Sequence, residues 1–502
     1  MPEKLYFLST KPGIKRDGTE FESNFFNDGQ HVRWQRGRPR KMGGYREVSD
    51  NFTGPVRGMN LSSYDGVTSL HSGSSSKLER VEIDQNGFGA GIVDRTPAGF
   101  ATDSRIVWQF DQMWDANGSN MLVIAHGGYN VNAIDNSTAS PVYVGNVNAV
   151  TAFTAHGSSV AGGVVVLPPF LFLYDNNGYV QWSDANLPLT MTGGLSGSAR
   201  ITGSKIVKGL RFRGGPSNSP SGLLWSLDSL LRVSFVGGTA VFSFDTVSDQ
   251  VSVLSSSAII EYDGMFFWPA VDRFLMYNGV VREVPNQMNL NYFFDNLNYA
   301  CRQKVWAMKV PRYGEIWWFY PRGTATECTH AVIYNVREGT WYDTELARSA
   351  GHFAQVFRYP LMADSSPNGS TYPVWVHEVG WDKVVGSTTT AIESYFQTAD
   401  VSWCADGPLQ EQWNGTDRWT GILRVEPDFN QVGDMSVTVQ GRKYAKAPQE
   451  DVATYTFDPS TLKVDMKHQA RQMRLKFRSA TLGGFYEMGQ TLLKLNIGDG
   501  RQ

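Results

Sequence analysis

The sequence has few cysteines, no long apolar run and no export signal, and each shortage excludes a class of protein. Its three cysteines, Cys301, Cys328 and Cys404, are too few and too scattered for a disulfide framework or a thiolate metal cage. The best apolar stretch, residues 164–173, is interrupted by two prolines, so no membrane span is expected. The first residues lack the apolar core of a signal peptide. We therefore expect a protein of a reducing compartment.

The net charge of the chain is also close to zero. The chain has 45 Lys and Arg against 48 Asp and Glu, which gives a formal net charge of −3. This balance does not predict binding to nucleic acid or to a membrane surface. Any contact with a polyanion must therefore come from a local cluster of cations.

The common catalytic and cofactor motifs are missing too. The sequence contains no phosphate-binding glycine loop and no Gly-x-Ser-x-Gly elbow. Its eight histidines include no pair at one-turn helical spacing and have no cysteine neighbours. We therefore expect no cofactor, no metal and no enzymatic activity.

The residues that are present indicate an all-β fold. The chain has 51 Gly and 22 Pro, which long helices cannot absorb. Short runs rich in Val, Ile, Phe and Tyr recur from end to end, for example at 163–167 and 170–174, and they have the length and composition of strands. Asn-Gly and Asp-Gly pairs between such runs, including Asp263-Gly264, supply the positive φ angles of tight hairpins. Consecutive antiparallel strands follow from this pattern.

The hairpins form a coarse repeat. Three or four strands recur at a period of about 45 to 55 residues, which matches a propeller blade. Such units fill residues 55–402, and the period predicts a β-propeller of six blades, with seven left open. We assign four aromatic residues of one unit to its core rather than to a ligand platform: Trp306, Trp317, Trp318 and Trp341.

Other segments interrupt or flank the propeller. Residues 289–304 lack Gly and Pro and carry apolar residues at helical spacing, which predicts one inserted amphipathic helix. Residues 1–54 are assigned to an N-terminal arm or closing strands, and 403–420 to a linker loop. Residues 421–502 alternate apolar and polar positions, which predicts a C-terminal β-sandwich-like domain. A basic group at 467–478 is expected on the solvent face of one of its strands.

The strongest local charge signal lies near the N-terminus. Five cations stand close together in the sequence: Arg33, Arg36, Arg38, Arg40 and Lys41. Such a cluster can meet DNA phosphates or an acidic surface on a partner subunit. A solvated strand and loop with nothing bound also explains it, so contact with a partner, contact with DNA and no contact all stay open.

A set of short motifs runs in order along the whole chain. The opening contains Pro12-Gly-Ile14, Arg16-Asp-Gly-Thr19, Val32-Arg-Trp34, Gly37-Arg-Pro-Arg-Lys41 and Gly43-Gly-Tyr45. The expected helix at 289–304 and a unit that ends with residues 332–341 follow, and segments 471–477 and 493–497 close the chain. Together these motifs resemble tail hub or nozzle proteins of short-tailed bacteriophages, which are also called packaged-DNA stabilisation proteins.

This resemblance implies a structural virion protein with a β-propeller body. In that family six copies form a ring below the portal and adaptor proteins. The ring makes the distal tube through which phage DNA is retained and ejected, and it offers docking surfaces for tail fibres or spikes. The resemblance thus implies a homo-oligomer, the portal–adaptor ring, fibre or spike proteins and passing double-stranded DNA as partners. It places the protein in the virion tail after assembly in the host bacterial cytoplasm.

The N-terminal segment is our candidate for closing the propeller or gripping the neighbouring ring. The basic cluster supplies charge for such a contact. Gly43 and Gly44 allow two backbones to approach closely, because glycine has no Cβ.

Two other functions stay open. A propeller glycosidase or depolymerase acting on host surface glycans would need two acids at one funnel, and the candidates are Asp111, Asp115, Asp175 and Asp184. Most aspartates of this chain follow strands beside Gly or Asn, however, where an Asx turn is the simpler role. A carbohydrate-binding module would instead hold sugars on exposed Trp and Tyr side chains without assembling into a ring.

Overall fold

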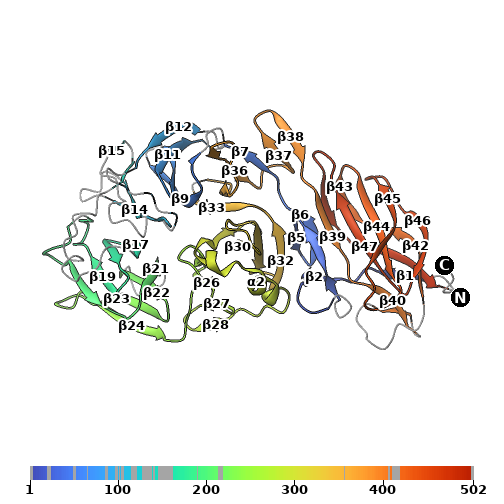
Figure 1. Ribbon diagram of the computed structural model, residues 1–502, viewed down its shortest axis with the longest axis horizontal. Helices are drawn as coiled ribbons and strands as arrows, with labels where there is room; N and C mark the ends of the chain where they lie inside the picture. The colour runs from blue at the N-terminus through green and yellow to red at the C-terminus, as the bar shows by residue number, and fades with distance from the viewer. Residues whose placement is uncertain are drawn as a thin grey trace.

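The computed structural model in Figure 1 describes most of the chain. The described residues are 4–19, 24–48, 52–64, 66–84, 89–96, 100, 102, 104, 107–114, 121–126, 138–139, 142–144, 162–188, 190–212, 219–355, 357–404, 407–409 and 419–498. Within these ranges the fold is nearly all β, with one short α-helix, as the Gly and Pro content and the strand pattern predict. None of the helices in these ranges has the length and apolar character to cross a membrane.

Seven small sheets follow one another along the described residues between 56 and 391, and the seventh also takes in a strand at residues 45–47. The first four contain β9 (Val56–Tyr64), β10 (Val67–Ser74), β11 (Leu78–Ile83) and β12 (Gly89–Asp94); β13 (Gln109–Trp114), β14 (Met121–His126), β15 (Thr138–Ala139) and β16 (Val142–Val144); β17 (Gly163–Leu167), β18 (Phe170–Tyr174), β19 (Tyr179–Trp182) and β20 (Gly197–Arg200); and β21 (Ile206–Arg211), β22 (Ser221–Ser226), β23 (Leu230–Phe235) and β24 (Phe242–Ser248).

The last three sheets complete this series. They contain β25 (Ile260–Tyr262), β26 (Met265–Pro269), β27 (Phe274–Tyr277) and β28 (Val281–Glu283); β29 (Trp306–Val310), β30 (Glu315–Tyr320), β31 (His330–Asn335) and β32 (Thr340–Glu345); and β33 (Arg348–His352), β34 (Leu361–Asp364), β36 (Val374–His377), β7 (Tyr45–Glu47), β37 (Asp382–Val385) and β38 (Thr388–Ala391). A separate pair joins β8 (Phe52–Thr53) to β35 (Thr371–Tyr372).

The seven sheets are arranged in a propeller-like manner. The first strand of one sheet contacts the first strand of the next from β9 through β13 and β17 to β21, and again from β25 through β29 to β33, which contacts β9. Figure 1 shows the sheets around a common centre, with the C-terminal sheets to one side. The sequence predicts six units and leaves seven open, and the described residues form seven sheets in this propeller-like series.

Local sequence explains the hairpins and the packing inside these sheets. Asp263 and Gly264 join β25 to β26 with φ angles of 49° and 78°, which is the turn predicted from the Asp-Gly pair. All four tryptophans assigned to the core of the sixth sheet are buried: Trp306, Trp317, Trp318 and Trp341. Their assignment to the core is therefore confirmed.

The inserted helix departs from the prediction. The expected single helix over 289–304 is broken into α2 (Leu290–Asn296) and the 3-10 helix η2 (Tyr299–Lys304). Leu297 and Asn298 between them have extended ψ angles of 126° and 91°. The backbone N–H and the side-chain amide of Asn298 both donate to carbonyls of the loop after β30. These contacts override the helical pattern, because propensity is weak beside tertiary bonds.

The C-terminal sheets pack beside the sixth and seventh sheets. They contain β1 (Lys4–Phe7), β49 (Leu492–Ile497), β42 (Thr420–Glu426) and β46 (Val464–Ala470); β4 (Asp28–Gln30), β39 (Ser394–Gln397), β47 (Gln472–Ser479), β40 (Val401–Cys404), β41 (Gly407–Leu409), β44 (Met435–Arg442) and β45 (Glu450–Phe457); β43 (Phe429–Val432), β48 (Phe485–Met488), β6 (Arg38–Lys41) and β5 (Val32–Gln35); and the pair β2 (Lys11–Ile14) and β3 (Phe25–Phe26). One apolar core includes Phe396 and Phe477 and continues into the sixth sheet at Trp306 and Phe319.

The molecule has two halves, the propeller-like sheets and the C-terminal sheets, and the N-terminal segment contributes strands to both. β1, β4, β5 and β6 belong to the C-terminal sheets, whereas β7 pairs with β36 of the seventh propeller-like sheet. Part of the expected linker at 403–420 lies outside the described residues, and its described portion includes β41 paired with β40. The prediction of a wholly solvent-facing group at 467–478 is wrong for Arg474, which is buried and paired with Asp400.

Candidate functional site

Arg33, the first cation of the basic cluster, is completely buried between the two halves of the molecule. Its Nη1 and Nη2 donate to the two carboxylate oxygens of Glu378 at 2.9 and 2.6 Å, and its Nε lies 3.0 Å from Oε1 of Glu315. The guanidinium also stacks on Tyr313, 3.7 Å from the ring centroid. Burial opposes the charge on Arg33, but the two carboxylates outweigh burial and raise the pKa of Arg33 above its ordinary value. Arg33 thus binds β5 to the sixth and seventh sheets.

Lys41, the last cation of the cluster, is also buried, with 1% of its surface exposed. Its Nζ donates to the carbonyl oxygen of Gly484 at 2.8 Å. Burial lowers the pKa of Lys41 to about 8. The structure therefore places both ends of the cluster in the interior, where a partner surface or a DNA phosphate does not reach them.

The three middle cations lie nearer the surface. Arg36 is exposed in a left-handed turn with a φ of 53°, and the backbone N–H groups of Arg36 and the next residue donate to the carboxylate of Glu338. Arg38 donates to Oε1 of Gln490 at 2.5 Å, and Arg40 lies 3.7 Å from a carboxylate on β48. Of the five predicted contact residues, these three remain at or near the surface.

Gly43 and Gly44 lie where the N-terminal segment passes close to the seventh sheet. A Cβ on Gly43 would stand 2.7 Å from Cα of Glu378, and a Cβ on Gly44 would stand 2.5 Å from the backbone nitrogen of Asp382. Real Cβ atoms do not tolerate such distances, so only glycine fits at either position. The predicted close backbone approach at these two glycines is confirmed.

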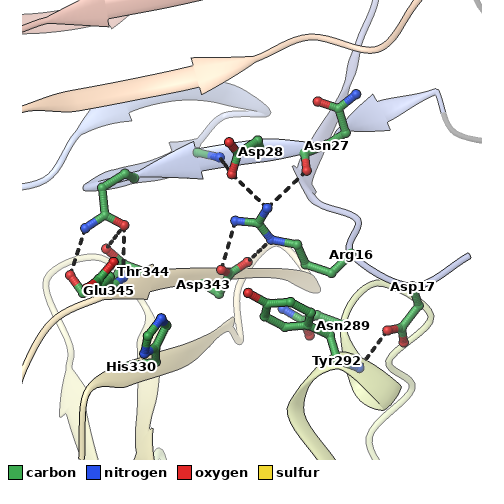
Figure 2. Close-up of polar contacts among 12 residues, drawn as sticks. Arg16, Asp17, Asn27, Asp28, Asn289, Tyr292, His330, Asp343, Thr344 and Glu345 are labelled. Carbon is green, nitrogen blue, oxygen red and sulfur yellow. Dashed lines mark hydrogen bonds and ion pairs between the residues drawn. The ribbon is translucent and has the colours of Figure 1, made fainter. Parts of the chain in front are cut away.

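A second ion cluster joins the N-terminal segment to the sixth sheet (Figure 2). Arg16 points between two carboxylates. Its Nε and Nη2 donate to Asp343 of β32 at 3.0 and 3.1 Å, and its Nη1 lies 2.7 Å from Oδ1 of Asp28 in β4. Burial opposes the charge, yet Asp343 and Asp28 outweigh it, and the pKa of Arg16 is raised. Two-pronged pairing of this kind fixes the orientation as well as the distance of the partners.

Asp17 connects the same segment to the inserted helix. Its Oδ2 and Oδ1 accept hydrogen bonds from the backbone N–H groups of Asn291 and Tyr292 at 2.9 and 2.8 Å. Figure 2 shows the contact with Tyr292. These N–H groups belong to the first turn of α2 and have no partner within the helix. A carboxylate there also complements the positive end of the helix dipole. Arg16 and Asp17 therefore attach the N-terminal segment to both the sixth sheet and α2.

A cavity of about 300 Å³ lies among the first strands of the propeller-like sheets. Its walls come from β9, β13, β21, β29 and β33 and from the segment that leads into β25. Four cations line it, namely Arg57, Lys208, Lys304 and Lys309. The cavity is therefore a polar, positively charged space within the ring of sheets.

Three of these cations have carboxylate partners. Arg57 Nη2 and Lys304 Nζ donate to the same Oε1 of Glu327 at 2.6 and 2.7 Å. Lys309 Nζ donates to Oε2 of Glu261 at 2.9 Å. Each carboxylate is thus already engaged with the wall of the cavity.

Lys208 differs from the other three cations. Its backbone pairs with Trp225 in the sheet, but its Nζ makes no hydrogen bond or ion pair with any residue that the structure describes. Burial lowers the pKa of Lys208 to about 8, and Asp111 opposes this only in part. His352, across the cavity on β33, has its pKa lowered to about 4 by burial and by Lys309 and Lys208. A neutral imidazole therefore faces the lysines at neutral pH.

The aspartates that a glycosidase would use are occupied by backbone groups. Each of three described aspartates accepts two backbone N–H hydrogen bonds, at 2.8 to 2.9 Å: Asp111, Asp175 and Asp184. At Asp175 one bond comes from the N–H group two residues on, as the Asx-turn interpretation predicts. Asp184 instead accepts from the next residue and from Leu195, so it joins the two ends of a loop. Asp115 lies outside the described residues.

The described residues hold no group of potential metal ligands, and one of their two free thiols is buried. No group of three His, Cys, Asp or Glu side chains within them is placed to hold a metal ion. Cys301 and Cys328 are free thiols, and burial raises the pKa of Cys328. A protonated, buried thiol is a poor nucleophile.

Sequence reasoning missed both the junction at Arg16 and the cavity. Arg16 stands in a motif that carried the resemblance, but its partners Asp28 and Asp343 are not marked by any local pattern. The cavity cations are widely separated in sequence, and their common signal is that each lies in or beside the first strand of a repeat unit. That signal needs the strand boundaries to be known first.

Comparisons with known proteins add little. No protein-family model matches the chain, and no curated protein matches it. One similar solved structure is the computationally designed Ika8 protein, with a TM-score of 0.34 and 8% identity, covering 66% of this chain and 99% of that one. Another is BBS1N in complex with ARL6DN, with a TM-score of 0.40 and 8% identity, covering 67% and 97%. Both TM-scores are below 0.5, so neither similarity assigns a fold or a function to this chain.

Proposed function

We propose that this chain is a structural tail protein of a short-tailed bacteriophage, in which a hexameric ring of copies forms the distal nozzle or hub that retains and then releases packaged DNA. Its body is a seven-bladed β-propeller and its C-terminal part is a β-sandwich-like domain. The ring attaches to the portal–adaptor complex, lets double-stranded DNA pass and offers surfaces to fibres or spikes. The protein resides in the virion tail after assembly in the host bacterial cytoplasm.

The observation that carries this proposal is the junction built by the N-terminal segment. The segment pairs with the C-terminal sheets through β1, β4, β5 and β6 and with the seventh sheet through β7. Arg33 adds a fully buried ion pair with Glu315 across the same junction, and Arg16 adds a partly buried one with Asp343. Removing one partner of a buried pair typically costs about 3–5 kcal/mol. The two halves are therefore held as one unit, as a tube under the load of DNA ejection requires.

The residues that carry the resemblance are also those that build the junction. Motif residues 12–19 include Arg16 and Asp17, which hold the sixth sheet and α2. Motif residues 32–45 include Arg33 and the two glycines that touch the seventh sheet. A shared junction gives a physical reason for these motifs to recur in a family of tail proteins.

Within this proposal, Arg36, Arg38 and Arg40 are the contacts for a partner ring or for DNA, because they are the members of the cluster at or near the surface. The glycosidase or depolymerase alternative is less favoured, since Asp175 and Asp184 are engaged with backbone N–H groups of a turn and of a loop. The carbohydrate-binding alternative is less favoured too. Among the described residues, the exposed Trp and Tyr side chains are Trp114 in β13, Tyr299 in η2 and Tyr444 in the loop after β44, and no two of them share an element.

The experiment that tests the proposal is the mass of the purified full chain, alone and mixed with isolated portal–adaptor complexes, by native mass spectrometry. We expect a hexamer, or a monomer that becomes a ring on the complex. The variant Arg36→Glu/Arg38→Glu should weaken attachment, whereas Lys467→Glu, an exposed cation on β46, is the matched control. A chain that stays monomeric and binds neither complex contradicts the proposal.

A further inference from the structure

We propose that the cavity among the first strands of the propeller-like sheets binds a small phosphate-bearing anion, with Lys208 as its principal contact. The site is separate from the junction at Arg16 and Arg33, and the inference does not depend on the tail assignment. It rests on the cavity itself, on the unpaired lysine, on the balance of charge around it and on donor groups that lack acceptors.

The cavity has the size and character of a ligand site. Its volume of about 300 Å³ is at the lower end of the range for small-molecule pockets, about 300–1,000 Å³. Trp108, Trp306 and Met59 contribute apolar wall, while Lys208, Lys309 and Ser257 contribute polar groups. A few polar groups converging in a partly apolar hollow are typical of binding sites, and the volume excludes a nucleic acid duplex as the occupant.

Lys208 lacks an acceptor where one is expected. It is partly buried, and among the described residues nothing accepts a hydrogen bond from its Nζ. The acid whose charge acts on it, Asp111, already accepts two backbone hydrogen bonds from Val166 and Gln112 at 2.8 Å. A buried ammonium without a partner is costly. An anion in the cavity removes that cost.

The charges around the cavity favour a ligand with more than one negative charge. Four cations line it, and the carboxylates that pair with them are Glu261 and Glu327. With Asp111 counted as well, the cations still exceed the carboxylates. Lysine binds phosphate as a point charge, and several lysines around one space suit a tetrahedral dianion better than a neutral sugar or a single carboxylate.

Two further donors on the wall have no acceptor. The Nε of Arg57 and the Nδ2 of Asn60 are buried and make no hydrogen bond with any described residue. Both side chains belong to β9 and line the cavity, with 7% and 4% of their surfaces exposed. Buried donors of this kind are rarely left unsatisfied. An oxygen-rich anion supplies the missing acceptors after a small rearrangement of the side chains.

The test is calorimetric titration of the full chain with two probes at constant ionic strength, inorganic pyrophosphate and ADP. We expect at least one probe to bind with one site per chain. The variant Lys208→Met keeps the length of the side chain without its charge and should weaken binding at least tenfold. Lys467→Met, which removes an exposed cation on β46 far along the sequence, should leave binding unchanged.

The two probes separate the possible sources of the phosphate. Binding of pyrophosphate alone assigns the cavity to an inorganic or small organic phosphate, and tight binding of ADP assigns it to a nucleotide. Ser257→Glu adds a carboxylate to the wall and should abolish binding of either probe, which provides a second variant if Lys208→Met does not fold. No binding of either probe at millimolar concentration, or equal affinity in wild type and a folded variant, overturns the proposal.

Discussion

Two groups of cations in this molecule differ in opposite ways between their spacing in the sequence and their positions in the structure. The N-terminal cluster is contiguous in the sequence, yet Arg33 and Lys41 are buried with their own partners and only the middle cations stay at or near the surface. The cavity cations are scattered along the sequence, yet they line one space. A run of charge in a sequence is therefore a poor guide to a charged surface in a β protein.

The physical reason lies in strand geometry and topology. Successive side chains of a strand point to opposite faces, and along β6 Arg38 and Arg40 lie nearer the surface while Lys41 is buried. In β5, by contrast, Val32, Arg33 and Trp34 are all buried. The first strands of the propeller-like sheets contact one another in turn, and one side chain from each can meet the others. Strand alternation disperses local charge, and the repeated topology gathers distant charge.

The largest expected effect is on the junction. Arg33→Met leaves Glu315 and Glu378 buried without their cation, and we expect a loss of about 3–5 kcal/mol in the free energy of unfolding. Chemical denaturation measures it. Arg36→Met is the control and should change stability by less than about 0.5 kcal/mol. Adding Glu315→Gln and Glu378→Gln to Arg33→Met should restore part of the loss, and equal effects for Arg33 and Arg36 would contradict the comparison.

The second-largest expected effect is a loss of folding stability at acidic pH. The pKa of His31 at the junction and that of His352 at the cavity are both lowered to about 4, mainly by burial. Between pH 6.5 and 4 the unfolded chain therefore binds protons that the folded chain does not, so stability falls as the pH drops through this window. At pH 5 each histidine should cost about 1–2 kcal/mol.

Thermal unfolding of the wild type and of His352→Gln at pH 7 and pH 5 measures this effect. His352 is paired with Leu361 through its backbone, but its imidazole makes no hydrogen bond with a described residue, so the variant tests protonation with little loss of structure. Its loss of stability between the two pH values should be smaller than that of the wild type. An identical loss in both proteins would show that His352 does not contribute.

A smaller effect separates two lysines with the same lowered pKa. The pKa values of Lys41 and Lys208 are both lowered to about 8, mainly by burial, but only Lys41 has an acceptor, the carbonyl of Gly484. Lys41→Met leaves that carbonyl unpaired and should cost about 1 kcal/mol. Lys208→Met removes an unpaired buried charge and should be neutral or stabilising by about 1 kcal/mol. Denaturation midpoints at pH 7 compare them, and equal destabilisation would contradict the difference.

The smallest effect on stability is expected at the exposed turn. Arg36→Glu/Arg38→Glu changes charges at or near the surface and should alter the free energy of unfolding by less than about 0.5 kcal/mol. Denaturation in parallel with Lys467→Glu provides the comparison. A larger loss would mean that these arginines belong to the junction rather than to a contact surface.

Some of the fold and little of the candidate site could be predicted from the sequence. The strand pattern gave the all-β class, and the Asp263-Gly264 turn, the buried tryptophans and the close approach at Gly43 followed from single-residue physics. The break at Asn298 did not, because its hydrogen-bond partners lie in another loop. The same holds for Arg33, whose burial depends on two carboxylates far along the chain.

Hydrogen exchange of the full chain tests most directly the central claim that the N-terminal segment is a structural junction and not a free arm. The account predicts that amides of β5, β6 and β7 exchange as slowly as those of β30 in the core of the sixth sheet, and far more slowly than those of the exposed strand β38. Exchange of β5 to β7 at the rate of β38, with β30 still protected, would contradict it.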